Sequence, residues 1–209
     1  MSSMWRFAVI LPVLLTTAAS SAAQYSAPAP AYAPPQASVT SSVSYALADW
    51  RRLRQSSGYG FADYARFLIY NPGWPEESKL RRWAERSMRP GENPATVISF
   101  FATDKPRSGN GWARLADSYA AGSRMAEALD AARFAWASDD LGATDEQALY
   151  ARYGRSFTAA DHDRRIDSLL FAKKADDAAR IYSLTSPARQ ASFAARIAMQ
   201  RKAPNADAL

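Results

Sequence analysis

The apolar residues of this chain recur at helical spacing. In the stretch 61–86 they lie three and four residues apart along two segments, as on one face of an amphipathic helix. The Asn-Pro-Gly sequence at 71–73 separates the segments, because proline disfavours helical backbone in the residue before it and glycine permits a turn. We therefore predict two helices and a corner, with Trp74 as a buried wedge and Pro75 at the first helical position. The predicted apolar faces are Phe61, Tyr64, Ala65 and Leu68, then Leu80, Trp83, Ala84, Ser87 and Met88.

The same spacing predicts further helices up to residue 201, and no stretch alternates with the period of two that is typical of strands. Helix starts are predicted at Asn93-Pro94, Ser123, Thr144 to Gln147 as a capping box, Thr158 with Asp161, and Ser186-Pro187, with a loop at 106–111. The predicted buried residues are Ala46, Trp50, Leu53, Val97, Phe100, Phe101, Trp112, Leu115, Ala116, Tyr119, Met125, Leu129, Ala132, Trp136, Ile166, Leu169, Leu170, Phe193 and Ile197.

Residues 111–137 form the clearest predicted hairpin. Its first segment carries large apolar residues, its second is rich in alanine, and Gly122 lies between them, as in a tetratricopeptide-like unit. Such a unit cannot bury its apolar faces alone and needs neighbours of the same kind. The sequence therefore predicts an all-α fold of stacked helical hairpins over residues 43–201.

The ends of the chain have a different composition. Residues 1–23 combine a basic start, an apolar run at 7–15 and small residues before Gln24, which predicts a cleavable signal peptide. The apolar run is shorter than the roughly 20 residues that a membrane-spanning helix needs, so we expect no stable membrane anchor and a soluble periplasmic protein. A linker rich in Pro, Ala and Ser is expected at 24–42 and a disordered tail at 202–209.

The composition limits the kinds of partner and site that the chain can have. The formal net charge of +6 favours anionic partners, and the absence of cysteine excludes disulfides and thiolate metal sites. Export makes nucleic acid an unlikely choice of anion, so no nucleic-acid partner is expected. No phosphate- or dinucleotide-binding glycine motif occurs, and no cofactor is predicted.

Two groups of residues follow one another in a recognisable order. The first is Trp50, Leu53, Tyr64, Phe67, Leu68, Pro72, Trp74, Pro75, Leu80, Ala84 and Glu85; the second is Gly111, Leu115, Ala116, Gly122, Arg133, Trp136, Asp161, His162, Arg165, Asp167, Leu169 and Leu170. In this order the chain resembles, from Tyr45 to Gln200, the N-terminal helical superhelix of soluble lytic murein transglycosylases.

The resemblance implies a curved superhelix, which in that family wraps into a ring and supports a separate lysozyme-like catalytic domain. The family cleaves peptidoglycan between N-acetylmuramic acid and N-acetylglucosamine and leaves an anhydro sugar. It implies peptidoglycan or a lysozyme-like catalytic domain as partners of this chain.

The catalytic part of the family is not expected here. In the family it follows the superhelix and carries a Glu-Ser pair with glycines downstream, whereas Glu77-Ser78 of this chain lies in a predicted first helical turn without those glycines. A catalytic acid needs a raised pKa, and the positive end of a helix lowers the pKa of a glutamate instead. We therefore expect the scaffold of such an enzyme, with no catalytic residue and no activity alone.

His162 lies among acidic and basic residues at 161–167. A catalytic interpretation would need a nucleophile and an orienting group, for which no local motif argues. Acid–arginine pairs at a helix start are the favoured, structural interpretation. The interleaved arginines also argue against a calcium loop, so no metal site is predicted.

Two basic clusters, at 51–54 and 79–89, remain. They are either solvated helix faces or contacts to anionic wall polymer, for which Arg81, Arg82 and Arg86 are the candidates. Two functional classes stay open: a peptidoglycan-associated scaffold, and a non-enzymatic periplasmic helical-repeat adaptor that binds a protein partner.

Overall fold

The computed structural model describes residues 39–204, with side chains described from Val43 onward. The expected signal peptide at 1–23, the expected linker up to residue 38 and residues 205–209 of the expected tail lie outside this range. The first described helix begins at Val39, so residues 39–42, which we expected in the linker, are helical.

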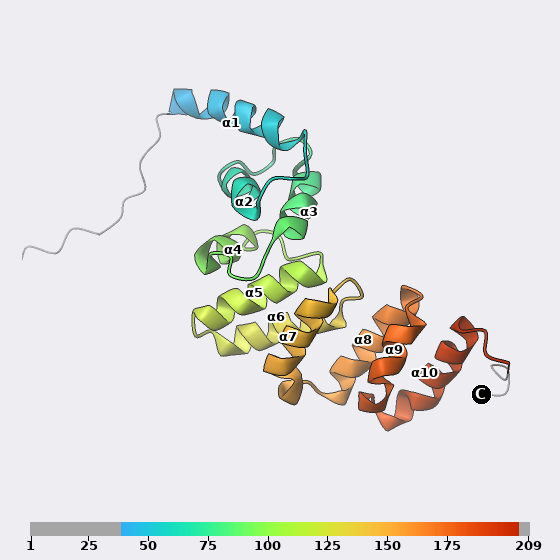
Figure 1. Ribbon diagram of the computed structural model, residues 1–209. Helices are drawn as coiled ribbons and strands as arrows, with labels where there is room; N and C mark the ends of the chain where they lie inside the picture. The colour runs from blue at the N-terminus through green and yellow to red at the C-terminus, as the bar shows by residue number, and fades with distance from the viewer. Residues whose placement is uncertain (1–38, 205–209) are drawn as a thin grey trace, which may run out of the picture. The chain divides into compact units, whose positions relative to one another are not determined.

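Residues 39–204 are all-helical, with ten α-helices, two short 3₁₀-helices and no strand (Figure 1), which confirms the predicted all-α class. The α-helices are α1 (Val39–Leu53), α2 (Phe61–Tyr70), α3 (Glu77–Ser87), α4 (Pro94–Phe100), α5 (Gly109–Ala121), α6 (Met125–Ala137), α7 (Ala143–Tyr153), α8 (Ala159–Phe171), α9 (Ala175–Ile181) and α10 (Pro187–Gln200). The 3₁₀-helices are η1 (Gly154–Ser156) and η2 (Tyr182–Leu184).

Most helices that follow one another along the chain pack together (Figure 1). The most extensive contact joins α5 to α6, which form the predicted hairpin, and α2 packs on α3 and α8 on α9. Between these pairs, α4 contacts α2 and α5, α6 contacts α8, and α10 contacts α8 and α9. A helix in the middle of this series therefore has neighbours on more than one side.

The predicted apolar faces make up most of the core. Met125 is the clear exception, because 57% of its surface is exposed at the first residue of α6. Trp50, Trp83, Trp112, Tyr119 and Leu129 are half-buried against the core. The predicted core residues that are buried are Ala46, Leu53, Phe61, Tyr64, Ala65, Leu68, Leu80, Ala84, Met88, Val97, Phe100, Phe101, Leu115, Ala116, Ala132, Trp136, Ile166, Leu169, Leu170, Phe193 and Ile197.

Trp74 occupies the corner between α2 and α3, as predicted, but it is half-buried rather than fully buried. Its ring lies edge-on to Phe67 at 5.6 Å between centroids and is tilted against Trp50 at 6.2 Å. The indole N–H of Trp50 donates to the carbonyl of Pro75 at 2.8 Å. The corner thus joins α1 to the α2–α3 pair.

Two predicted helix starts are confirmed by their hydrogen bonds. The Asn93 side chain accepts from the backbone N–H of Thr96 at 3.0 Å, and proline follows it at the first turn of α4. Thr158 and Asp161 form a reciprocal capping box at the start of α8. Both signals are local, and each satisfies a backbone N–H at the helix start that has no partner within the helix.

Other predicted helix starts differ from the structure in their position or in their cap. At α7, Thr144 does not cap, because the helix begins at Ala143 after Gly142 and no side chain caps it. Ser123 adopts a left-handed conformation, with φ of 58°, and Arg124 precedes α6 instead. Helix α3 begins at Glu77, two residues after Pro75, and α5 begins at Gly109 inside the predicted loop 106–111. Ser186 precedes α10 as predicted, but its side chain does not cap that helix.

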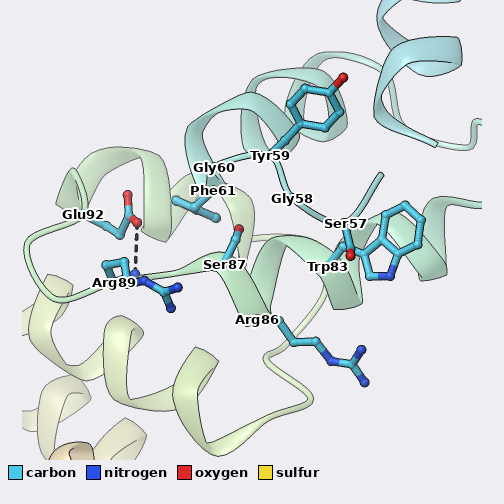
Figure 2. Close-up of a pocket in the computed structure, with 10 residues that line it drawn as sticks. All are labelled: Ser57, Gly58, Tyr59, Gly60, Phe61, Trp83, Arg86, Ser87, Arg89 and Glu92. Carbon is cyan, nitrogen blue, oxygen red and sulfur yellow. Dashed lines mark hydrogen bonds between the residues drawn. The ribbon is translucent and has the colours of Figure 1, made fainter. Parts of the chain in front are cut away.

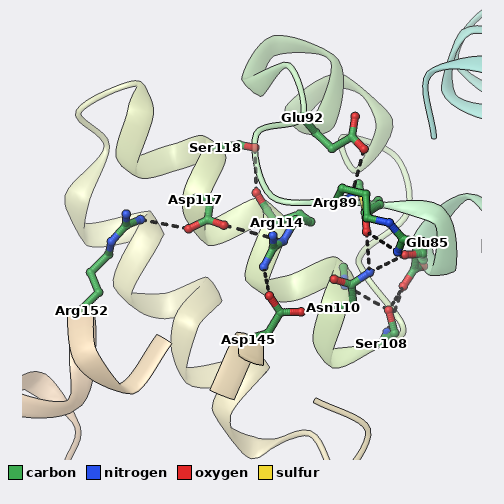
Figure 3. Close-up of polar contacts among 12 residues, drawn as sticks. Glu85, Arg89, Glu92, Ser108, Asn110, Arg114, Asp117, Ser118, Asp145 and Arg152 are labelled. Atoms are coloured by element: carbon green, nitrogen blue, oxygen red, sulfur yellow. Dashed lines mark hydrogen bonds and ion pairs between the residues drawn. The ribbon is translucent and has the colours of Figure 1, made fainter. Parts of the chain in front are cut away.

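Two buried carboxylates form hydrogen bonds with residues that precede helices and lie more than 20 residues away in the sequence. Glu85 of α3 accepts from the backbone N–H groups of Arg107 and Ser108 at 3.0 Å each, and from the Ser108 hydroxyl at 2.6 Å (Figure 3). Asp163 of α8 does the same for Ser186, at 3.0 Å from its N–H and 2.6 Å from its hydroxyl. In each case the acid side chain orders the residue that precedes a helix, α5 or α10.

Buried arginines tie further helices together. Arg114 of α5 pairs with Asp145 of α7 and lies 3.7 Å from Asp117, which also binds Arg152 at 2.9 Å (Figure 3). Arg165 of α8 pairs with Glu146 of α7 at 2.6 Å. Asp145 and Glu146, the two middle residues of the predicted capping box, therefore serve as partners of buried cations.

Candidate functional site

Arg81 does not lie on a solvated face, so its assignment as a wall-polymer contact is wrong. Its surface is 5% exposed, and its Nε atom lies 2.8 Å from Glu77 and 3.0 Å from Asp104. Its Nη1 atom donates to the carbonyl of Phe100 at 3.2 Å. Helix α3 packs against α2 and against α5, so it has two buried faces where the apolar pattern indicated one.

The basic cluster at 51–54 is largely neutralised. Arg52 pairs with Asp49 and Asp63 at 3.4 and 3.3 Å, and Arg54 pairs with Glu76 at 2.8 Å. Such exposed pairs contribute little to stability, but they cancel the charge that an anionic ligand would meet. This cluster is therefore a poor candidate for a binding surface.

The cluster at 79–89 keeps more of its positive charge exposed than the cluster at 51–54 does. Two cations of the cluster, Lys79 and Arg81, form ion pairs with acidic residues. Arg82, Arg86 and Arg89 are exposed and have no acidic partner among the described residues. Arg82 and Arg86, one helical turn apart, share a face of α3, and Arg89 follows its end. We call these three residues the arginine stripe.

A pocket of about 490 Å³ lies beside this stripe, between the loop 57–60 and the second half of α3 (Figure 2). We call it the Trp83 pocket. Among the residues that line the pocket, Figure 2 shows Trp83 toward one end and the Arg89–Glu92 pair toward the other, with Ser87 between them. Its lining residues are Ser57, Gly58, Tyr59, Gly60, Phe61, Trp83, Arg86, Ser87, Arg89 and Glu92.

The Trp83 ring is fixed in place by its neighbours. It packs against Tyr64 at 6.4 Å between centroids, and the Lys79 ammonium lies 4.6 Å from its ring centre. The Glu92 carboxylate accepts from the backbone N–H of Arg89 at 3.0 Å, whereas the side chains of Arg86 and Arg89 are not paired with any acid in the described part of the chain. The pocket therefore combines an aromatic wall with two exposed guanidinium groups. Sequence periodicity placed Trp83 in the apolar face and gave no signal for the pocket.

Glu77 is not placed to act as an acid catalyst. Its carboxylate accepts from Arg81 at 2.8 Å and from the backbone N–H of Gly73 at 2.7 Å. Partial burial would raise its pKa, but these two hydrogen bonds outweigh burial and lower the pKa below its usual value. The carboxylate is ionised at neutral pH, whereas a general acid must be protonated.

The contacts of His162 fit the structural interpretation. The side chain is buried, and the Trp136 indole N–H donates to its Nδ1 atom at 3.2 Å. Its ring lies edge-on to Trp136 and Phe157. Burial lowers the pKa of His162 and outweighs the opposite effect of Asp161 and Asp163. The imidazole is therefore neutral, with Nδ1 as an acceptor.

This lowered pKa predicts a loss of stability in mild acid. The unfolded chain binds the proton near the ordinary pKa of 6.5, before the folded chain does, so the free energy of unfolding should fall as the pH drops below 6.5. Urea unfolding of the wild type and of His162→Asn between pH 8 and pH 5.5 measures this effect. The variant should show a smaller change with pH, and equal changes would contradict the assignment.

Other kinds of site find no support in the described part of the chain. No group of three His, Cys, Asp or Glu side chains there is placed to hold a metal ion. No helix within residues 39–204 has the length and apolar character needed to cross a membrane. The charged pocket beside α3 is thus the candidate functional site.

Comparison with protein-family models, with curated proteins and with solved structures gives no match to this chain. The candidate site therefore depends on its own geometry.

Proposed function

We propose that the helical region is a periplasmic, peptidoglycan-associated scaffold of the lytic transglycosylase type, with its helix pairs stacked as hairpins in a curved superhelix. It holds anionic wall polymer on the surface of α3 and does not cleave the glycan by itself. One observation carries the proposal: within residues 43–204, the three exposed guanidinium groups of the arginine stripe have no acidic partner, whereas most neighbouring cations are paired with acids.

The electrostatics of the stripe suit a polymer better than a small ion. Exposed cations attract anions over about 10 Å at 0.1 M salt, which is more than the distance between successive turns of a helix. Three cations in sequence at Arg82, Arg86 and Arg89 therefore act together on a chain with repeated negative charges. A solvated helix face of ordinary composition would pair these cations with acids one turn away, as Arg81 is paired with Glu77.

Co-sedimentation with purified sacculi tests this proposal. The bound fraction should be highest at low salt and should be largely lost by a few tenths molar NaCl, because exposed charges are screened at that ionic strength. Binding that does not change between 0.05 and about 0.5 M salt would contradict an electrostatic scaffold.

An adaptor that binds a protein partner is the second candidate, and a specific feature favours it. Phe134 is 55% exposed on α6 and stacks on Trp112 at 4.5 Å between ring centroids. Exposed aromatic residues are common in protein interfaces. This function predicts little sedimentation with sacculi at any salt concentration, and recovery of a protein partner that is lost in Phe134→Ser.

A further inference from the structure

The Trp83 pocket contains groups that suit a charged sugar. Its volume of about 490 Å³ is within the range of small-ligand sites, which runs from about 300 to 1,000 Å³. An indole offers a flat apolar surface with a polar N–H at its edge. At the rim, Arg86 and Arg89 provide guanidinium groups, which bind carboxylates through paired, charge-assisted hydrogen bonds.

We propose that the Trp83 pocket binds a pyranose ring that carries a carboxylate, with the ring against Trp83 and the carboxylate held by Arg86 and Arg89. The inference rests on the proposed function and narrows it from a charged surface to a site for wall sugars whose carboxylate is free, such as N-acetylmuramic acid units that carry no peptide. The arginine stripe alone would attract any polyanion, whereas this pocket selects by shape and by the position of the charge.

The other lining groups favour a sugar acid over a phosphate. Glu92 lines the pocket and keeps a carboxylate oxygen beyond the one that accepts from Arg89, so it can accept from a sugar hydroxyl. Its negative charge disfavours a dianionic phosphate more than a monoanionic carboxylate. Ser57 and Ser87 add hydroxyl groups to the lining.

Indole resonances of the ¹⁵N-labelled chain report on this site directly. N-Acetylmuramic acid and glucuronic acid, which carry a carboxylate, are compared with N-acetylglucosamine and glucose, which do not. The Trp83 resonance, assigned with Trp83→Phe, should move with the acidic sugars, and the neutral sugars should bind at least about 10-fold more weakly, since one charge-assisted contact contributes roughly 1.4 kcal/mol or more. Inorganic phosphate serves as a further probe and should leave the resonance in place.

Matched variants separate the site from the general charge of the chain. Arg86→Gln/Arg89→Gln should remove the preference for acidic sugars, whereas Arg155→Gln, an exposed arginine of η1, should leave it unchanged. Equal shifts with acidic and neutral sugars, shifts with phosphate of the same size, or movement of other indoles but not of Trp83 would each overturn the inference.

The two proposals fail in different ways. If sacculi bind in a salt-dependent manner but no sugar moves the Trp83 resonance, this inference is wrong and the scaffold proposal stands. If acidic sugars move the resonance but sacculi do not bind, the pocket exists and the scaffold proposal is wrong.

Discussion

Replacement of Arg165 by methionine is expected to lower the free energy of unfolding by about 3 to 5 kcal/mol, the range for removing one partner of a buried ion pair. Arg165 is 2% exposed, and its Nη2 atom lies 2.6 Å from Glu146. Its guanidinium also donates to the carbonyl of Trp136 at 2.7 Å and lies 4.3 Å from the Trp136 ring centre. The variant would leave Glu146 with its charge and without its closest cation.

Arg180 provides the matched control, because it faces the same acid from the surface. Its side chain is 61% exposed and its nitrogen lies 3.7 Å from Glu146. Arg180→Met should therefore cost less than about 1 kcal/mol. The double variant Arg165→Met/Glu146→Gln should recover part of the loss, since it removes both charges. Urea unfolding measures all three, and a loss below about 1 kcal/mol for Arg165→Met would show that the buried pair does not hold α7 to α8.

A second large effect is expected from one added methyl group. Gly111→Ala should destabilise the protein by about 2 to 4 kcal/mol, although alanine in a helix is intrinsically better than glycine by up to about 1 kcal/mol. A Cβ atom at residue 111 would lie 2.7 Å from the Glu85 carboxylate and 3.1 Å from Pro106. Glu85 would have to move away from the N–H groups that it accepts from, and charged hydrogen bonds contribute about 1.5 to 3 kcal/mol each.

Gly142→Ala is the control for this change. A Cβ atom at residue 142 would meet no other atom within 4 Å, and the backbone φ of −67° suits alanine. Because residue 142 precedes α7, where alanine is less favourable than glycine, the expected loss is small but not zero, below about 1 kcal/mol. Thermal and urea unfolding distinguish the two variants. If Gly111→Ala is as stable as the wild type, the Glu85 contact at the start of α5 is not close-packed.

Local patterns were sufficient for much of the fold. The helical spacing of Phe61, Tyr64 and Leu68 predicted a buried face, and all three residues are buried. Asn93 and Thr158 were identified as caps because the groups that they bind lie within three residues. Hydrophobic period and cap chemistry are properties of a single helix, so a single sequence is enough to find them.

Buried charges could not be predicted in this way. A charged residue next to the apolar face of a helix is normally predicted to be exposed to solvent. Four such residues are buried instead: Arg81, Glu85, Arg114 and Arg165. Each is stabilised by groups that lie about 20 or more residues away in the sequence, such as Ser108 for Glu85. The helix-start prediction at Thr144 also failed, because α7 begins at Ala143 and no side chain caps it. Asp145 and Glu146, the two middle residues of the predicted capping box, bind arginines of α5 and α8.

The candidate site was predicted in part. The sequence identified the basic cluster and two of its exposed residues, Arg82 and Arg86, because a local excess of basic residues can be read from the sequence. It did not identify the Trp83 pocket, since the loop 57–60 and the end of α3 meet only after α2 and α3 have packed. Tertiary packing, which no local pattern encodes, creates the pocket.

The most direct test of the scaffold proposal compares two triple variants on sacculi at low salt. One replaces the arginine stripe, Arg82→Gln/Arg86→Gln/Arg89→Gln, and the other replaces three exposed cations elsewhere, Arg51→Gln/Arg155→Gln/Lys173→Gln. Both lose three positive charges, so they differ in position and not in net charge. We expect the stripe variant to stay in the supernatant and the second variant to sediment as the wild type does. Equal sedimentation of the two variants would contradict a binding surface on α3.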